Sequence, residues 1–397
     1  MSMTLLPPIF IVALAMLLPV AAVSGWFLGR RNSERSRRAG VSELSSSYFR
    51  GLNYLLNEQP DKAIEVFLKL AEFNRDTVET HLALGNLFRR RGEVDRAIRV
   101  HQHLIARPNL SNEEKTIALL ELGEDYMRAG LLDRAETLFT DLVAMDAQVP
   151  SALRHLIGIY QHEKDWGKAI DHARRLEKIS GDSQGPVIAQ FYCEQAEQAR
   201  AAKNFADAHD HLSHAFESQP ECVRAYIVLG HVEMQQGHLD AATEAFERVA
   251  TLDVDFVPEV LPPLLDCYAR LQQMERAEKF LFDAIERSQG VTPVIALARL
   301  YASTQGEQAA IDFLTRQLRQ RPSVRGLMTL IGATLHKSEG EARENLLILQ
   351  DLTRKLIEGQ AMYRCSRCGF GAKAHHWQCP SCKTWGSVRP IHGVAGE

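Results

Sequence analysis

The sequence predicts an all-α architecture with three parts: one membrane-spanning helix, a long array of paired helices and a small C-terminal metal-binding module. Three observations predict it: an uncharged apolar segment near the N-terminus, a pattern that recurs about every 34 residues, and four of the seven cysteines in the last 33 residues. The 397 residues are 45% hydrophobic and 24% charged, as in globular proteins. The net charge of −4 gives no basic field for nucleic acid, so we expect no such partner.

The N-terminal segment has the length and composition of a membrane span. Leu5–Leu28 contains 24 residues without a charge, and about 20 apolar residues cross the hydrocarbon core. A cleaved signal peptide would begin with a positive region, which Met1–Pro8 lacks. Five arginines follow the span, at positions 30, 31, 35, 37 and 38, and such clusters stay in the cytoplasm. We therefore predict an uncleaved anchor over 1–29, a basic juxtamembrane linker over 30–43, and a cytoplasmic location for the rest.

A helical repeat follows the linker. Gly85 is followed by Phe88 three residues later and by Ala97 twelve residues later. Small or apolar residues with the same downstream spacing recur at steps of 33 to 39 residues, at Gly51, Gly85, Gly123, Ile157, Ala196, Gly230, Leu265, Ala298 and Gly332. Glu344 replaces the expected alanine in the last of these units. Self-similarity at this period is typical of solenoids built from helix pairs.

The pattern resembles the tetratricopeptide repeat, in which a small residue on the first helix faces an alanine on the second. We identify eight repeats over 44–322 and a degenerate ninth over 325–357, and hence one solenoid domain over 44–357. Stacked pairs bury one another's apolar faces. Two longer steps place short insertions at Pro108–Glu114 and Ser180–Gly185, which are rich in turn-forming residues.

First-helix residues of such arrays line the concave face, where a basic patch would suit an acidic peptide. The candidate partner-binding residues are Asn86, Arg89, Arg90 and Arg128. The alternative is that these arginines only form a solvated helix end. Charge reversal at Arg89 and Arg90 is expected to change fold stability little. A carboxylate clamp is not expected, because Leu52 and Ile117 stand where polar clamp residues are needed.

The C-terminal segment carries a metal-site pattern. The predicted ligands are Cys365, Cys368, Cys379 and Cys382, two C-x-x-C knuckles separated by ten residues. This spacing suits one tetrahedral ion, with Gly369 allowing the turn of the first knuckle. Disulfides are disfavoured in a reducing cytoplasm, and thioredoxin-like chemistry needs a βαβ context that is lacking. The motif resembles a rubredoxin-type ribbon over 358–397. Four sulfur ligands suit either iron or zinc, so the identity of the metal stays open. Because four protein ligands leave no coordination position free, we expect the site to be structural.

The remaining candidate residues have simpler interpretations. His375 and His376 are expected at the surface because four cysteines complete the ligand shell. Cys193, Cys222 and Cys267 fall in helical repeats and are expected to be buried as small hydrophobic residues. We find no phosphate-binding loop, nucleophile elbow or dinucleotide motif. The chain is therefore not expected to be an enzyme.

The three parts together resemble the lipopolysaccharide assembly protein B family over essentially the whole chain. The resemblance rests on LLPVAAVSGWFLGRR at 17–31, GNLFRRRGEVDRAIR at 85–99, and YRCSRCGF with WQCPSCKTW in the tail. It implies a single-pass inner-membrane protein that lowers lipopolysaccharide by promoting proteolysis of the lipid A deacetylase LpxC by the membrane protease FtsH. The alternatives are a passive platform for synthesis enzymes and, less favoured, an electron carrier. The sequence leaves open whether the chain forms a homodimer or binds other membrane proteins.

Overall fold

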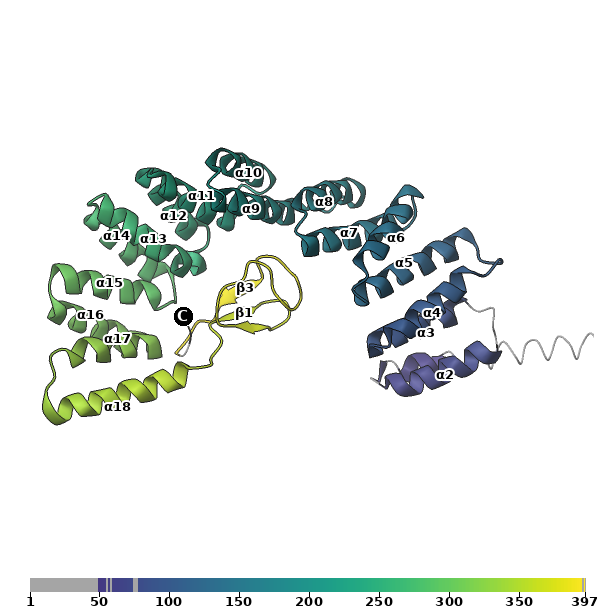
Figure 1. Ribbon diagram of the computed structural model, residues 1–397. Helices are drawn as coiled ribbons and strands as arrows, with labels where there is room; N and C mark the ends of the chain where they lie inside the picture. Colours follow the sequence, from purple (N-terminus) through teal and green to yellow (C-terminus); the bar gives the residue numbers. More distant parts are fainter. Residues whose placement is uncertain (1–48, 55, 58, 74–77, 395, 397) are drawn as a thin grey trace, which may run out of the picture. The chain divides into compact units, whose positions relative to one another are not determined.

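The computed structural model describes residues 49–394 and 396, apart from 55, 58 and 74–77 (Figure 1). The predicted anchor and basic linker lie outside these residues. Within the described part of the chain, no helix combines the length and the apolar character needed to cross a bilayer. The structure divides into two compact units, one ending at Ile159 and the other beginning at Tyr160.

The first unit consists of antiparallel helix pairs. Its helices are α2 (Pro60–Phe73), α3 (Val78–Arg91), α4 (Val94–Ile105), α5 (Asn112–Arg128), α6 (Leu132–Ala144) and most of α7 (Val149–Glu163). The predicted insertion before α5 forms a capping box: Ser111 accepts a hydrogen bond from the Glu114 N–H, and the Glu114 carboxylate accepts one from the Ser111 N–H. Both orphan N–H groups are thereby satisfied, which fixes the start of α5.

The second unit continues the same arrangement. Its helices are α8 (Trp166–Ser180), α9 (Gly185–Ala201), α10 (Phe205–Ser218), α11 (Val223–Gln236), α12 (Leu239–Leu252), α13 (Val257–Arg270), α14 (Met274–Arg287), α15 (Thr292–Thr304), α16 (Glu307–Gln320), α17 (Val324–Leu335) and α18 (Gly340–Ile357), with a 3₁₀ turn, η1, at Val254–Phe256. The paired helices predicted from the repeat are confirmed, and the residues of the degenerate ninth unit also form a helix pair, α17 and α18.

Close approach of the two helices in a pair depends on the small residue of the first helix. A Cβ atom added to Gly123 or Gly230 would lie 2.5 Å from the ring of Phe139 or Phe246, respectively. Each ring belongs to the residue four positions after the repeat's alanine, and both rings are fully buried. The glycine therefore makes room for an aromatic ring of the second helix, whereas the repeat pattern predicts that it faces the alanine.

A small three-stranded antiparallel sheet completes the second unit. The strands are β1 (Tyr363–Cys365), β2 (Gly371–Ala372) and β3 (Val388–Pro390), in the order β2-β1-β3. Tyr363 pairs with Ala372 on one side and with Pro390 on the other. Figure 1 shows this ribbon in yellow, on the inner side of the curve that the helix pairs of the second unit form.

Candidate metal centre and its docking surface

The first cysteine knuckle begins where β1 ends. Cys365 is the last residue of β1, and Gly369 adopts φ +77°, a left-handed conformation that glycine adopts without strain. This turn directs the backbone N–H groups of Arg367 and Cys368 toward the Cys365 sulfur. The turn predicted at Gly369 is confirmed.

The second knuckle repeats this geometry with a different residue in the turn. The N–H groups of Ser381 and Cys382 point toward the Cys379 sulfur, and Lys383 adopts φ +58° at the position that Gly369 has in the first knuckle. A left-handed lysine carries a steric cost that the surrounding sheet must offset. The sequence gives no sign of this conformation at Lys383.

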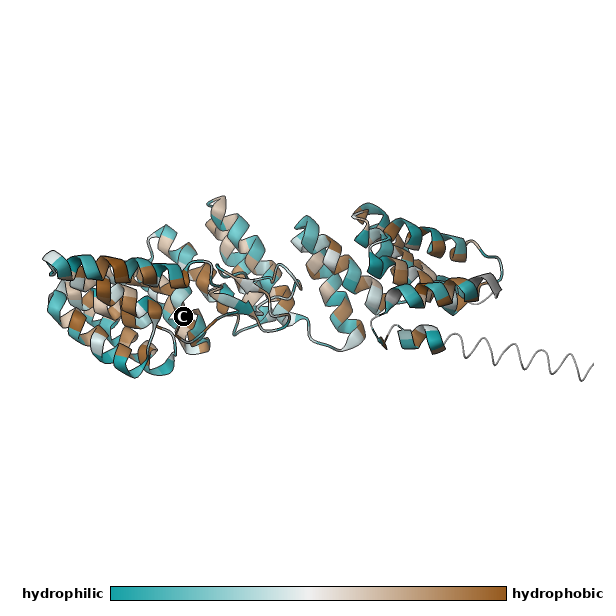
Figure 2. Cartoon of the chain, turned by 90° about the horizontal axis from the view of Figure 1, so that it is seen from below, coloured by the Kyte–Doolittle hydropathy of each residue, from teal (hydrophilic) through white to brown (hydrophobic). Residues whose placement is uncertain are grey.

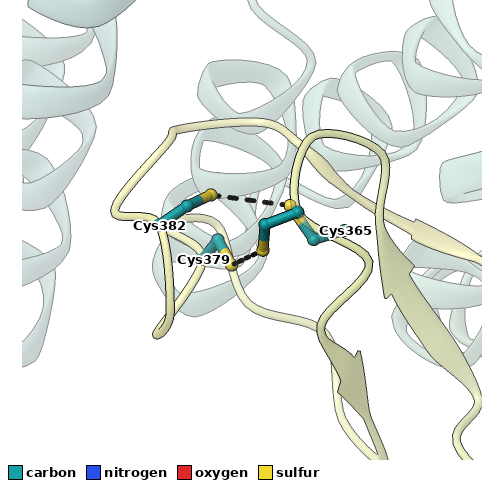
Figure 3. Close-up of side chains that lie close together, drawn as sticks. Cys365, Cys379 and Cys382 are labelled. Atoms are coloured by element: carbon teal, nitrogen blue, oxygen red, sulfur yellow. Dashed lines mark hydrogen bonds between the residues drawn. The ribbon is translucent and has the colours of Figure 1, made fainter. Parts of the chain in front are cut away.

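The four predicted ligands converge on one point. Their Sγ atoms all lie within 4.8 Å of one another, with 3.7 Å between Cys365 and Cys382 and 3.7 Å between Cys368 and Cys379. Four sulfurs held about 2.3 Å from one ion in a tetrahedron are about 3.8 Å apart. The donor set therefore fits one tetrahedral metal ion, and Figure 3 shows the sulfurs of the labelled cysteines facing one another.

The protein stabilises the thiolate form at two of these sulfurs. A hydrogen bond between Ser387 Oγ and Cys365 Sγ, 3.3 Å apart, is the main cause that lowers the pKa of Cys365 to about 6. The Thr384 side chain lowers the pKa of Cys382 in the same way. Burial raises the pKa of Cys379 to about 11. Metal ligation requires thiolates, so Cys379 is the ligand for which deprotonation is most costly without an ion.

Arg224 forms one set of contacts between the metal module and the array. This side chain on α11 is 2% exposed and forms ion pairs with Glu194 at 2.8 Å and Glu197 at 3.3 Å. Its guanidinium carbon lies 5.5 Å from the ring centroid of Trp377 and 5.7 Å from that of Trp385, both in the module. A desolvated guanidinium against two indole faces is a strong cation–π arrangement. Arg224 therefore connects the two parts of the second unit.

A second set of contacts surrounds Trp385. Its indole N–H donates to Gln161 Oε1 at 2.9 Å, and the same oxygen accepts a hydrogen bond from Gln378 at 2.8 Å. The ring also packs edge-on against Trp166 and Phe191, with centroids 6.3 and 6.0 Å away. The tryptophan thus buries its apolar body and satisfies its polar edge at one site on the array.

Polar contacts fix the ends of the sheet. The Tyr363 hydroxyl donates to Glu259 at 2.6 Å, and His392 lies 3.0 Å from Asp255. Arg389 forms an ion pair with Asp253, and its guanidinium lies over the ring of Phe256, 4.9 Å from the centroid. These contacts come from the central strand β1, from β3 and from the segment after β3, and together they fix the orientation of the ribbon on the array.

The expectation that His375 and His376 both lie at the surface is wrong for His375. His376 is exposed, but His375 is partly buried between the rings of Trp377, Phe256 and Tyr363, with centroids at 4.5, 5.3 and 5.6 Å. Burial lowers the pKa of His375 to about 4, and its Nε2 is buried without a hydrogen-bond partner. The reason is the docked module, which the sequence pattern does not reveal.

The three cysteines of the helices are confirmed as buried residues. Cys193 and Cys267 have no exposed surface, and Cys222 is 5% exposed at the N-cap of α11. Burial raises the pKa of the Cys193 and Cys267 thiols. They serve as small core side chains, separate from the metal ligands.

The predicted partner-binding residues lie in the first unit and differ in environment. Arg89 is largely enclosed and forms ion pairs with Glu121, Glu124 and the fully buried Asp125, at 2.7, 2.8 and 2.8 Å. Its charge pairs with acidic residues of the next repeat, so the expectation that charge reversal here would change fold stability little is wrong for Arg89. Asn86 is also largely enclosed, with its side-chain oxygen buried and unpartnered.

Arg90 and Arg128, in contrast, are exposed. With Arg89, Glu124, Met127 and His155 they line a depression of about 580 Å³. Of the ion pairs found among the described residues, none involves Arg90 or Arg128. These two charges are therefore available to a ligand, whereas the charge of Arg89 is compensated.

Sequence reasoning missed the residues that dock the metal module. A signal was present: Trp377 and Trp385 both stand in a tail too short to bury two indoles in a core of its own. Arg224 gave no comparable signal, because nothing in its position in α11 distinguishes it from other helical arginines.

A helical repeat array that carries a four-cysteine ribbon defines a class of non-enzymatic, protein-binding scaffold. Tetratricopeptide repeat models match residues 80–113, 120–184 and 199–262, and a rubredoxin metal binding domain matches 363–390. The chain belongs to the lipopolysaccharide assembly protein B family. It is 40% identical to that protein of Escherichia coli (strain K12), covering 96% of this chain and 99% of the relative.

The chain is also similar to a second relative and to a solved structure. The chain is 35% identical to lipopolysaccharide assembly protein B of Haemophilus influenzae, over 95% of this chain and 98% of the relative. Among solved structures, it is similar to the MamA protein, with a TM-score of 0.33, 22% identity, and 46% of this chain and 95% of that chain covered.

Proposed function

We propose that this protein is an inner-membrane adaptor that lowers lipopolysaccharide levels by presenting the deacetylase LpxC to the protease FtsH. Membership of the lipopolysaccharide assembly protein B family, over 96% of the chain, carries this proposal. The repeat array supports it, because stacked helix pairs offer an extended surface for protein partners. The family resemblance supplies the identities of FtsH and LpxC.

The membrane location follows from the segment that precedes the described residues. Leu5–Leu28 is the anchor, and the five arginines after it hold the array in the cytoplasm. We accordingly assign the anchor to residues 1–29, the linker to 30–43, the solenoid to 44–357 and the metal domain to 358–397. Confining adaptor and protease to one bilayer raises their effective concentration without any new contact. A soluble client held by the array would then be near the protease.

The surface that we assign to partner binding is the depression beside Arg90 and Arg128. These exposed cations, with Met127 forming an apolar part of the lining, suit an acidic segment that also carries an apolar side chain. Arg89 and Asn86 support this surface from within the unit. The metal module binds one iron or zinc ion and has a structural role in the second unit.

Depletion of the protein tests the proposed function. The half-life of LpxC, followed by immunoblotting after translation is stopped, should lengthen on depletion, and lipopolysaccharide should rise. Overproduction should have the opposite effect. A depleted strain with an unchanged LpxC half-life would exclude the adaptor function and favour the second candidate, a passive platform for lipopolysaccharide-synthesis enzymes.

A further inference from the structure

The terminal helix of the array leaves an apolar stripe uncovered. Four large side chains of α18, Ile348, Leu349, Leu352 and Leu356, are between 50 and 64% exposed. At about 100° per residue, they lie on one side of the helix within about a third of its circumference. The neighbouring side, about 90° further round and including the buried Thr353, packs against α17.

The position of this stripe is unusual for a solenoid. The last repeat of an array has no following repeat to cover it, so its outer face is normally polar. In the view of Figure 2, apolar residues appear in brown along the helices at this end of the second unit. After α18 the described chain turns into the ribbon, which docks elsewhere, on α7–α13. Among the residues that the structure describes, none covers the stripe, so it can pack against another surface.

We propose that α18 pairs antiparallel with α18 of a second copy of this chain, forming a two-fold symmetric dimer. Such an interface is self-complementary: each stripe covers the other, and every contact occurs twice. With the crossing point near Leu349, Ile348 packs against the partner subunit's Leu352, and Leu352 packs against the partner subunit's Ile348. The same stripe on each copy then forms that copy's half of the interface.

The charges beside the stripe favour this occupant. Glu344 and Lys355 are eleven residues apart, three helical turns, and so lie on the same flank of the stripe. In antiparallel helix pairs, equivalent flanks face each other, which places Glu344 beside the partner subunit's Lys355 and Lys355 beside the partner subunit's Glu344. Parallel pairing would separate these opposite charges.

The same flank disfavours a lipid surface. It carries Glu344, Lys355 and Asp351, and Asp351 forms an ion pair with Lys355 at 2.8 Å. An amphipathic helix that lies on a bilayer has basic residues beside its apolar face. Here acidic residues outnumber the lysine, so a second copy fits the stripe better than an anionic membrane.

The test is sedimentation of the full-length chain in density-matched detergent. The unaltered protein should be a dimer at micromolar concentration, and Leu352→Asp should raise the dimer dissociation constant at least tenfold. Leu347→Asp is the matched control: Leu347 is also exposed on α18 but lies about 140° from Leu352, so the dissociation constant should change less than twofold. Circular dichroism should show the same helical content in all three proteins.

A charge exchange tests the antiparallel arrangement itself. Glu344→Lys and Lys355→Glu should each weaken the dimer severalfold, because like charges then face each other twice. The double variant should restore the dissociation constant of the unaltered protein to within about threefold, because every facing pair is again opposite in charge. A monomeric full-length chain, a dimer insensitive to Leu352→Asp, or a double variant no tighter than the single variants would each overturn the proposal.

Discussion

Arg224 and Trp377 are in contact across the boundary between repeat array and metal module, with 5.5 Å between the guanidinium carbon and the indole centroid. The arginine belongs to α11 and the tryptophan to the loop that leads to the second cysteine knuckle. An ion held by Cys379 would order that loop, which covers Arg224, a buried cation of the array. The metal site and the helical repeats of the second unit are therefore energetically coupled.

Removal of the Arg224 side chain should release the module from the array. Arg224→Ala leaves Glu194 and Glu197 without their cation and exposes one face of each of two indoles, which should lower the free energy of unfolding of the second unit by about 3 kcal/mol. Metal content should stay at one equivalent, because all four ligands lie within the module. Urea unfolding and elemental mass spectrometry measure the two effects.

The matched control for this change is Arg270→Ala. Arg270 is half exposed on α13 and, within the described part of the chain, its one ion pair is with Asp266 one turn away, so its loss should cost less than about 0.5 kcal/mol. If Arg224→Ala were no more destabilising than Arg270→Ala, the coupling through Arg224 would be refuted.

Loss of one ligand should empty the metal site. Cys365→Ser removes the thiol that Ser387 and two backbone N–H groups prepare for ligation, so the bound metal should fall well below one equivalent. The sheet should unfold, while most helical content should persist because solenoid repeats are stabilised mainly by their neighbours. Ser381→Ala, an exposed change within the second knuckle, should retain the metal. One equivalent of metal in Cys365→Ser would show that the four-cysteine assignment is wrong.

Docking of the module should weaken as the pH falls. The folded pKa of His375 is about 4, below its ordinary value of 6.5, so between these values the folded protein binds fewer protons than the unfolded one. The contribution of His375 to the free energy of unfolding is therefore fully present above pH 6.5 and is lost as the pH falls toward 4. At pH 5 the loss is about 2 kcal/mol. Urea unfolding at pH 7.5 and 5 measures it.

A comparison of two neighbouring histidines isolates this effect from other titrating groups. His375→Leu should reduce the difference in stability between pH 7.5 and 5, since the buried ring that resists protonation is gone. His376→Leu, at an exposed position, should leave that difference as it is. An identical pH dependence in both variants would contradict the assignment to His375.

The arginines of the first unit should separate stability from binding. Arg89→Ala breaks three ion pairs, one of them with a fully buried aspartate, and should cost about 3 kcal/mol. Arg90→Glu with Arg128→Glu should change stability by less than about 0.5 kcal/mol, because both side chains are exposed. The double variant should nevertheless retain less LpxC or FtsH in pull-downs from detergent-solubilised membranes. Undiminished retention of both would place the docking surface on other repeats.

Much of the fold was predictable because it depends on local periodicity. The spacing from Gly123 to Ala135 requires two helices in close approach, and the structure has them. The ligand set was equally predictable, since two C-x-x-C knuckles bring four sulfurs together with little help from the rest of the chain.

Long-range contacts were not predictable in this way. The hydrogen bond from Trp385 to Gln161 joins residues 224 positions apart, and no period relates them. The internal role of Arg89 was hidden for the same reason: its acidic partners lie one repeat further along the chain and appear in the sequence as ordinary helix-surface charges.

The last prediction concerns the membrane anchor. A phosphatase that is active only in the periplasm, fused after Glu397, should be inactive, because five arginines follow the apolar span Leu5–Leu28 and none precede it. A fluorescent protein that folds only in the cytoplasm should be bright at the same position. Replacing the five arginines by glutamine removes the orientation signal, so part of the fusion population should then gain phosphatase activity. Strong phosphatase activity in the unaltered fusion would contradict the predicted topology and, with it, access of the array to a cytoplasmic deacetylase.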